Sequence, residues 1–200
     1  MSDKHILIIN GHPDAQGEHY DHALADAYAE GAESAKYEVK RVDVAALDFP
    51  FLRNQQAFET EAVPSCIAES QQLISWANHL LIVFPLWHGT TPAYFKAYIE
   101  QVFRYGFGFG NTDPNVKEGR WPKKHLAGKS ARIVVTMGMP SIVYRSYCGG
   151  HGVKYLKRSV LGLSGVKPIK INLIGMVDAK SKRSRKRWIE KMRLRGAKGI

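Results

Sequence analysis

Five short segments rich in apolar residues are spaced along this 200-residue sequence. They span residues 6–9, 39–44, 80–84, 133–137 and 169–174. Short apolar runs without alternation, such as residues 6–9, are typical of strands buried on both faces of a parallel sheet. Segments that favour helices lie at residues 20–35, 65–77, 92–103, 155–161 and 183–195. This order constrains the fold more than any other feature, because parallel neighbours must be joined by crossover connections, usually helices.

The alternation of strands and helices predicts an α/β fold. Five strands in this arrangement favour a flavodoxin-like, doubly wound parallel sheet with strand order 2-1-3-4-5 and helices on both faces. The sequence has no internal repeat or linker, so we expect residues 1–200 to form a single domain. Residues 105–130 are rich in Gly, Asn, Pro and Lys and predict a long surface excursion. Residues 180–200 predict a basic C-terminal helix or tail.

Charge is distributed very unevenly along the chain, whose net charge is +11. Residues 1–100 hold 14 acidic and 6 basic residues, whereas residues 101–200 hold 4 acidic and 23 basic ones. The last basic cluster is interleaved with four apolar residues, Trp188, Ile189, Met192 and Leu194, which predict a helix with one docked face. The charge indicates either an acidic partner, nucleic acid or a membrane surface, or a solvated face that aids solubility.

Several classes of protein are excluded. The longest apolar stretch, residues 80–87, is much shorter than the roughly 20 residues of a membrane helix, and the N-terminal apolar run is too short for a signal peptide. We therefore expect a cytoplasmic protein with no membrane span. Cys66 and Cys148 lie far apart without a CxxC pattern and predict two free thiols. The sequence lacks HExxH, clustered Cys and His, and GxSxG, so we expect neither a metal site nor a hydrolase.

In a doubly wound sheet, ligands bind beyond the carboxyl ends of the strands, where the strand order reverses. This rule selects three loops, at residues 11–21, 85–91 and 138–152. All three are rich in Gly, His, Pro or aromatic residues, which favours a role in binding. The first loop has neither GxGxxG nor a P-loop motif, which disfavours a dinucleotide-binding crossover and a P-loop NTPase. An anion can still bind at the N-terminus of helix 20–35.

The first two loops each have a structural and a functional interpretation. Asp21 is expected to cap helix 20–35. His12 and His19 are either phosphate ligands or ordinary surface residues. The second loop has prolines seven residues apart around Trp87, which suits a bound planar ring as well as it suits a stiff turn with a packed tryptophan.

The third loop brings Tyr144 and His151 to the same rim. A phenol and an imidazole can form a relay that supplies or stabilises a proton at a reacting ring. The alternative is that Tyr144 packs and His151 begins the next helix.

Three segments of these loops form an ordered set: ILIINGHPD at residues 6–14, FPLWHGTTPAYFKAYIEQVF at 84–103 and VVTMGMPSIVYRSYCGGHG at 134–152. Together with LGLSGVKPIKINLIG at 161–175, the set resembles the NAD(P)H:quinone oxidoreductases, which have the flavodoxin-like fold. The resemblance implies a bound flavin, FAD or FMN, that is reduced by NAD(P)H and reoxidised by a quinone or similar small electrophile in ping-pong fashion. It also implies a homodimer whose active site lies at the subunit interface.

The same resemblance implies roles for particular residues. Three would flank the flavin phosphates: His12, His19 and Tyr20. Five would meet the isoalloxazine ring: Pro85, Leu86, Trp87, His88 and Gly89. Four would lie at its other edge: Thr136, Met137, Gly138 and Met139. Tyr144 and His151 match the family's proton-relay pair, which would stabilise the negative charge of the reduced flavin.

The chain departs from the family pattern at three places. The third loop is one residue longer between Tyr144 and His151 than in the animal quinone reductases, so a hydrogen bond between these two side chains is a prediction. The family's phosphate loop presents Ser or Thr followed by Phe-Asn, whereas residues 16–21 of this chain read QGEHYD. Glu18 would oppose a phosphate unless it points away or pairs with His19 or a C-terminal base. Of the paired aromatics after Pro85, only Trp87 is present, which implies a more open or more polar pocket.

Two hypotheses about function follow. The chain is a flavin-dependent NAD(P)H dehydrogenase, or it is a flavin-binding regulatory or ancillary subunit with weak activity that docks an acidic partner through its basic half. Contact of residues 180–198 with nucleic acid is a third and less favoured interpretation.

Overall fold

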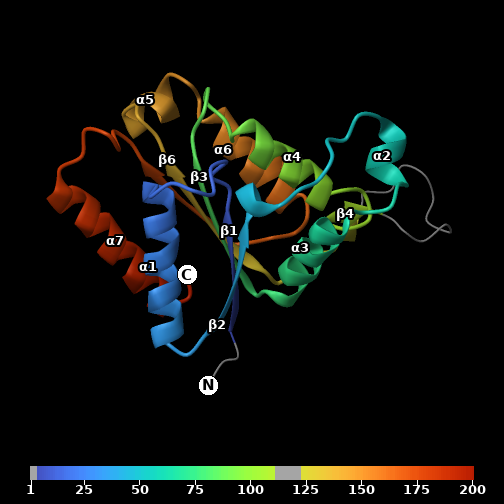
Figure 1. Ribbon diagram of the computed structural model, residues 1–200, viewed down its shortest axis with the longest axis horizontal. Coiled ribbons are helices and arrows are strands. Elements are labelled where there is room, and N and C mark those ends of the chain that lie inside the picture. Colours follow the sequence, from blue (N-terminus) through green and yellow to red (C-terminus); the bar gives the residue numbers. More distant parts are fainter. Residues whose placement is uncertain (1–3, 111–122) are drawn as a thin grey trace.

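A five-stranded parallel sheet forms the centre of the computed structural model, which describes residues 4–110 and 123–200 (Figure 1). Its strands are β1 (His5–Asn10), β2 (Glu38–Asp43), β3 (His79–Pro85), β6 (Ser130–Thr136) and β7 (Ile169–Ile174). They pair in the order β2-β1-β3-β6-β7, and all neighbours are parallel. The predicted fold class and strand order are therefore confirmed, and the five apolar runs mark the five strands.

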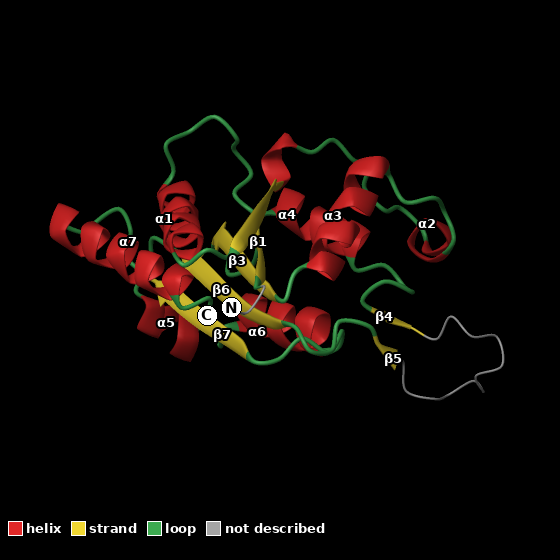
Figure 2. Cartoon of the chain, turned by 90° about the horizontal axis from the view of Figure 1, so that it is seen from below, coloured by secondary structure: helices red, strands yellow, loops and turns green. Residues whose placement is uncertain are grey.

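Helices cover both faces of this sheet, as Figures 1 and 2 show. One face is covered by α1 (Tyr20–Ser34) and α7 (Lys182–Ala197). The other is covered by α3 (Ser65–Trp76), α4 (Ala93–Val102) and α6 (His151–Tyr155), which continues as a π-helical segment at Leu156–Gly162. Alternate residues of a strand point to opposite faces of the sheet and pack against different helices. Ile6 and Ile8 share a core with α1, whereas Leu7 and Ile9 share one with α3 and α4. Both layers bury apolar side chains, which explains why the inner strands β1, β3 and β6 are largely apolar.

The contact between α1 and α7 is unusually close because each helix has a glycine at the crossing. A β-carbon on Gly31 would lie 1.9 Å from the carbonyl oxygen of Arg193. One on Gly196 would lie 1.9 Å from the carbonyl oxygen of Tyr28. Any side chain at these two positions would therefore meet the backbone of the other helix.

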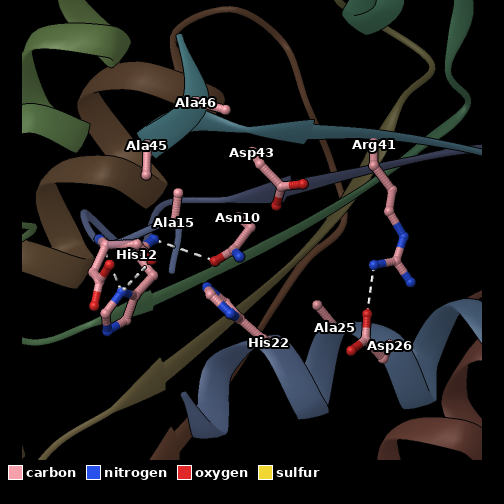
Figure 3. A pocket seen from close by; sticks show the side chains of 11 residues that line it. Asn10, His12, Ala15, His22, Ala25, Asp26, Arg41, Asp43, Ala45 and Ala46 are labelled. Atoms are coloured by element: carbon pink, nitrogen blue, oxygen red, sulfur yellow. Dashed lines mark hydrogen bonds and ion pairs between the residues drawn. The ribbon is translucent and has the colours of Figure 1, made fainter. Parts of the chain in front are cut away.

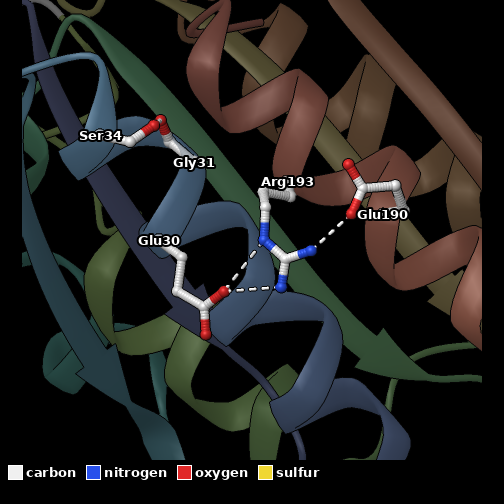
Figure 4. Close-up of polar contacts among 5 residues, drawn as sticks. All are labelled: Glu30, Gly31, Ser34, Glu190 and Arg193. Carbon is white, nitrogen blue, oxygen red and sulfur yellow. Dashed lines mark hydrogen bonds and ion pairs between the residues drawn. The ribbon is translucent and has the colours of Figure 1, made fainter.

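The basic helix α7 is docked through one face, as predicted. Met192 is fully buried, and Trp188 and Ile189 are half-buried, although Leu194 is exposed. Beside the crossing, Arg193 donates to the Glu30 carboxylate at 2.8 and 3.1 Å and to Glu190 at 2.5 Å (Figure 4). The pair with Glu30 ties α7 to the acidic outer face of α1, whereas Glu190 lies on α7 itself.

Several short elements were not predicted. α2 (Gln55–Glu59) lies in the segment 48–64, which we expected to be irregular, and the Asn54 side chain caps it by accepting from the Ala57 N–H at 2.7 Å. α5 (Ser141–Ser146) lies within the third loop, and η1 (Val44–Ala46) is a single 3-10 turn after β2. β4 (Phe109–Gly110) and β5 (Lys123–Lys124) pair antiparallel within the predicted excursion 105–130, of which residues 111–122 lie outside the described residues.

Both cysteines are free thiols, as predicted. The Cys66 thiol donates to the Asp48 carbonyl oxygen at 3.3 Å, and Cys148 follows α5. Across residues 4–110 and 123–200, no helix is both long enough and apolar enough to cross a membrane.

Candidate functional site

The loops that follow β1, β3 and β6 start from the carboxyl edge of the sheet, where backbone hydrogen bonds join them. The Gly11 N–H donates to the Val83 carbonyl at 2.7 Å, and the Leu86 N–H donates to the Thr136 carbonyl at 2.8 Å. A β-carbon on Gly11 would lie 2.5 Å from the Phe95 ring, so the first loop passes close over α4. The main chain thus fixes where all three loops begin.

A pocket of about 530 Å³ lies between the second and third loops, and we call it the β3–β6 pocket. It is lined by Leu86, His88, Gly89, Met137, Gly138, Met139, Cys148 and His151. All of these except Cys148 were predicted as site residues, and a lone thiol beside a glycine-rich turn gave no signal for its inclusion. Four predicted residues of these two loops do not line the pocket: Pro85, Trp87, Thr136 and Tyr144. The lining is largely apolar, which suits the face of an aromatic ring.

The second loop contains a tight turn from Trp87 to Thr90. The Trp87 N–H donates to the Thr90 carbonyl at 3.0 Å, and the Thr90 N–H donates back at 2.9 Å. Both central residues have positive φ, 46° at His88 and 80° at Gly89, as this kind of two-residue turn requires. The Trp87 side chain is 50% exposed. The turn is therefore stiff, and it leaves half of the indole surface exposed.

Tyr144 and His151 are not hydrogen-bonded to each other, although the structure describes both. Tyr144 is fully buried, and its hydroxyl donates to the Gly89 carbonyl and accepts from the Val153 N–H, both at 3.2 Å. These two backbone groups use the positions that a bond to the imidazole would need. His151 is exposed, begins α6 and lines the β3–β6 pocket. The placement matches the alternative in which the tyrosine packs and the histidine begins a helix. A role for the pair in proton transfer stays a prediction.

Three histidines gather at the start of α1, and we call His12, His19 and His22 the histidine cluster. The rings of His12 and His19 stack at 3.7 Å, and His22 meets them edge-on at 5.4 and 5.3 Å. His19 Nε2 lies 2.7 Å from the Asp14 carboxylate, so this histidine is paired with Asp14 and not with Glu18, which is exposed. Burial and the neighbouring His19 lower the pKa of His12. No group of His, Cys, Asp or Glu in the described part of the chain is arranged to hold a metal ion.

The first turn of α1 corrects one prediction. The helix begins at Tyr20, so its N-cap is His19 and not Asp21, which instead falls within the first turn and faces the sheet. The Tyr20 hydroxyl donates to the Arg185 carbonyl at 3.2 Å, and burial raises the pKa of this tyrosine to about 12. Its side chain therefore serves the contact with α7. The backbone N–H groups at the start of the helix have no intrahelical acceptor and can face an anion.

Asp21 is the most unusual residue of this region. Its side chain is 2% exposed, and within the described residues neither carboxylate oxygen has a hydrogen-bond partner. Burial raises the pKa of Asp21 to about 6, although Thr136 of β6 and His19 favour the charged form. Buried polar groups without partners are uncommon, and titratable groups with perturbed pKa values concentrate at functional sites.

The histidine cluster also borders a second pocket, of about 280 Å³, which we call the α1–β2 pocket (Figure 3). It is lined by Asn10, His12, Asp14, Ala15, His22, Ala25, Asp26, Arg41, Asp43, Ala45 and Ala46. Arg41 and Asp26 form an ion pair at 2.5 Å on its wall. The sequence gave no indication of this pocket, because β2 and α1 come together only through the pairing of β1 with β2.

A sequence model of the flavodoxin-like fold family matches residues 4–195. The chain belongs to this family. It is 30% identical over 156 residues to the ribosyldihydronicotinamide dehydrogenase-like protein traD of Penicillium crustosum, a match that covers 66% of this chain and 57% of that protein. It is 25% identical over 146 residues to an FMN-dependent NADH:quinone oxidoreductase of Pseudoalteromonas atlantica, which covers 68% of this chain and 69% of that protein.

Solved structures agree with this assignment of the fold. The crystal structure of Smu.1420 from Streptococcus mutans UA159 superposes with a TM-score of 0.81 at 23% identity, covering 97% of this chain and 99% of the other. The resemblance found in the three loops is thus confirmed at the level of the family. This flavodoxin-like chain spans little more than half the length of its relative from Penicillium crustosum.

The residues of this flavodoxin-like chain fit a flavin. The β3–β6 pocket offers an apolar lining for a planar ring. The first turn of α1 offers free N–H groups and two histidines for a phosphate. The buried and unpartnered Asp21 lies in that same turn, where a hydroxyl or a proton would complete its bonding.

Proposed function

We propose that this chain is a flavin-dependent NAD(P)H dehydrogenase that passes two electrons from NAD(P)H to a quinone or similar small electrophile in ping-pong fashion. The β3–β6 pocket carries the proposal, because it lies at the point where the strand order reverses and beside a helix start that suits an anion. The names of the two relatives support the same reaction class. A bound flavin supplies the hydride-accepting chemistry that side chains lack.

FMN is the form of the cofactor that we favour over FAD. The relative from Pseudoalteromonas atlantica is FMN-dependent by name. The α1–β2 pocket, which adjoins the histidine cluster, is lined by the three carboxylates of Asp14, Asp26 and Asp43. A second phosphate placed there would be repelled by them.

Each half of the site has its own task in this proposal. His12, His19 and the N–H groups of α1 bind the phosphate. The turn at 85–89 and the segment 136–139 hold the ring between them. His151 is exposed at the edge of the pocket, where it can hold or release a proton. Tyr144 acts as a positioning residue, because its hydroxyl fixes the Gly89 carbonyl and the start of α6.

We also propose a homodimer with the site at its interface. Six large apolar side chains are exposed in the loops around the β3–β6 pocket: Trp87, Met139, Ile142, Val143, Tyr147 and Met176. Tyr147 is 89% exposed. Clusters of exposed apolar groups of this kind mark interaction surfaces. The two free thiols are consistent with a cytoplasmic location, where thiols stay reduced.

A second candidate function is an ancillary flavoprotein that docks an acidic partner. The outward face of α7 carries Lys182, Arg183, Lys186 and Arg187, all exposed, and none is paired with an acid within residues 4–110 and 123–200. In this candidate the flavin would turn over slowly, and binding to the partner would depend strongly on salt.

The visible absorbance of the purified protein tests both proposals first, and the released cofactor is then identified by mass. Oxidation of NADH and NADPH with added quinone follows. We expect flavin bands, and we expect the His151→Ala variant to lose roughly 100-fold in turnover. His5→Ala, at the amino end of β1, serves as the control. Protein that binds neither FMN nor FAD contradicts both functions, whereas bound flavin with negligible turnover favours the ancillary one.

A further inference from the structure

Asp21 and the start of α1 present a conflict of charge. The free N–H groups and the positive end of the helix dipole favour an anion at this position. Asp21 belongs to the same turn, is 2% exposed and has no hydrogen-bond partner within the described residues. If it is ionised, it opposes the anion that the helix attracts.

The groups around Asp21 do not neutralise it. Thr136 of β6 faces it, and His19, from the loop before the helix, is the titratable group that favours its charge. His19 is already paired with the Asp14 carboxylate at 2.7 Å. Tyr20 on the same turn is held by α7 and has a pKa raised to about 12 by burial, so it stays neutral. No arginine or lysine of the described chain contacts the Asp21 carboxylate.

We propose that Asp21 is a neutral carboxylic acid whenever a flavin phosphate occupies the start of α1, so that binding of FMN takes up one proton at this residue. The proton comes from solvent and is bound by the carboxylate as the phosphate arrives. This inference rests on the proposed function, and it adds a regulation by pH to the same site.

The physical reason is that one buried charge must disappear before a second like charge can be placed beside it. Burial has already brought the pKa of Asp21 to about 6 in the free protein. A neighbouring phosphate raises it further, because like charges disfavour ionisation. Between these two pKa values, linkage makes the dissociation constant of FMN rise about tenfold for each unit of pH.

Two other titrations could produce a similar dependence and must be separated from it. His12, whose pKa is lowered by burial, gains charge as pH falls, and the phosphate of FMN itself has a second pKa near 6. Asp21→Asn removes the carboxylate while keeping the shape of the side chain. Riboflavin, which lacks the phosphate, removes the second charge. Glu33→Gln is the matched control, since Glu33 is an exposed acid near the other end of the same helix.

The experiment measures the dissociation constants of FMN and riboflavin between pH 6.0 and 8.5 at constant ionic strength, by quenching of flavin fluorescence. We expect Asp21→Asn to bind FMN at least tenfold tighter than the native protein at pH 8.5 and within about twofold of it at pH 6.0. Riboflavin should show no such difference. Calorimetry at pH 7.5 in two buffers of different ionisation enthalpy should show close to one proton more taken up by the native protein than by Asp21→Asn.

The outcomes distinguish this inference from the proposed function. Equal pH dependence in the native protein and Asp21→Asn would overturn the inference while leaving the flavin site intact. The same holds if Glu33→Gln behaves like Asp21→Asn, or if Asp21→Asn binds FMN more weakly at every pH. Absence of FMN and FAD binding in every variant, with circular dichroism showing a folded chain, would overturn the proposed function and the inference together.

Discussion

The two halves of the candidate site are built by different kinds of contact. Around the β3–β6 pocket, main-chain hydrogen bonds and close packing hold the loops, as in the turn from Trp87 to Thr90 and the two bonds of the Tyr144 hydroxyl. At the start of α1, side chains that titrate hold the loop, notably His12 and His19 with Asp14. We therefore expect pH to act mainly on the α1 half and changes of volume mainly on the pocket.

The largest expected effect is on stability at the α1 half. The folded-state pKa of Asp21, about 6, is raised above its ordinary value of 3.8. The stability that this group contributes is fully present below pH 3.8 and is lost as pH rises through 6. The free energy of unfolding of Asp21→Asn should thus exceed that of the native chain by as much as about 3 kcal/mol at pH 8. At pH 4 the two values should be nearly equal. Urea unfolding across this range checks the prediction, with Glu33→Gln as control, and parallel curves for Asp21→Asn and the native chain would contradict it.

The next largest effect on stability is expected at the β3–β6 pocket. A β-carbon on Gly152 would lie 2.5 Å from the Gly89 carbonyl oxygen and 2.6 Å from the Thr90 Cα, so backbone would have to move. Gly152→Ala should lower the free energy of unfolding by about 2 kcal/mol, at pH 4 and at pH 8 alike. Gly138→Ala is the matched comparison, because only the Asp178 carboxylate comes near, at 3.5 Å. Equal midpoints in urea for the two variants would show that these loops are not packed as described.

A smaller loss should follow from Tyr144→Phe, which leaves the Gly89 carbonyl and the Val153 N–H without their shared hydroxyl. We expect this change to lower the free energy of unfolding by about 1 kcal/mol. Tyr147→Phe, at an exposed side chain, should leave the stability unchanged. Thermal unfolding measures both, and a melting temperature for Tyr144→Phe equal to that of the native chain would argue that the hydroxyl does not fix the two loops.

The smallest effect on stability is expected at Trp87. Its side chain is half exposed, so Trp87→Ala should change the free energy of unfolding by less than about 0.5 kcal/mol. The same change should weaken FMN binding by roughly threefold to tenfold, if the indole contacts the ring. A loss of stability without a loss of affinity would reverse this assignment and place Trp87 in the fold.

Sequence patterns predicted the inner strands well because burial on both faces leaves a direct record in their residues, as in β3, which contains the expected strand 80–84. The expected strand at 169–174 coincides with the edge strand β7, and helix 20–35 differs from α1 by one residue at its end. Side-chain partners were predicted less well. The expected cap role of Asp21 failed because an N-cap shifted by two residues turns the side chain from the helix end to the sheet. The predicted hydrogen bond between Tyr144 and His151 is absent because the tyrosine hydroxyl bonds to the Gly89 carbonyl and the Val153 N–H instead, and these partners come together only in the fold.

One feature of the α1 half is visible in the spacing of the sequence. His19 and His22 are three residues apart at a helix start and so share one face. This spacing in the sequence indicates that His22 lies beside His19, and so adds a third histidine to the predicted phosphate ligands His12 and His19. The α1–β2 pocket had no such signal, since Arg41 and Asp26 meet only across two elements.

The glycine crossing of α1 and α7 has a consequence for how the chain can be shortened or diversified. Because Gly31 and Gly196 let the two backbones touch, the strongly basic segment 182–197 is part of the wall of the domain. Removal of that segment would uncover Leu24 and Tyr28 and release the phenol of Tyr20 at the start of α1. A library can therefore vary the outward charges at Lys182, Arg183, Lys186 and Arg187, provided that the two glycines, Met192 and Arg193 are kept.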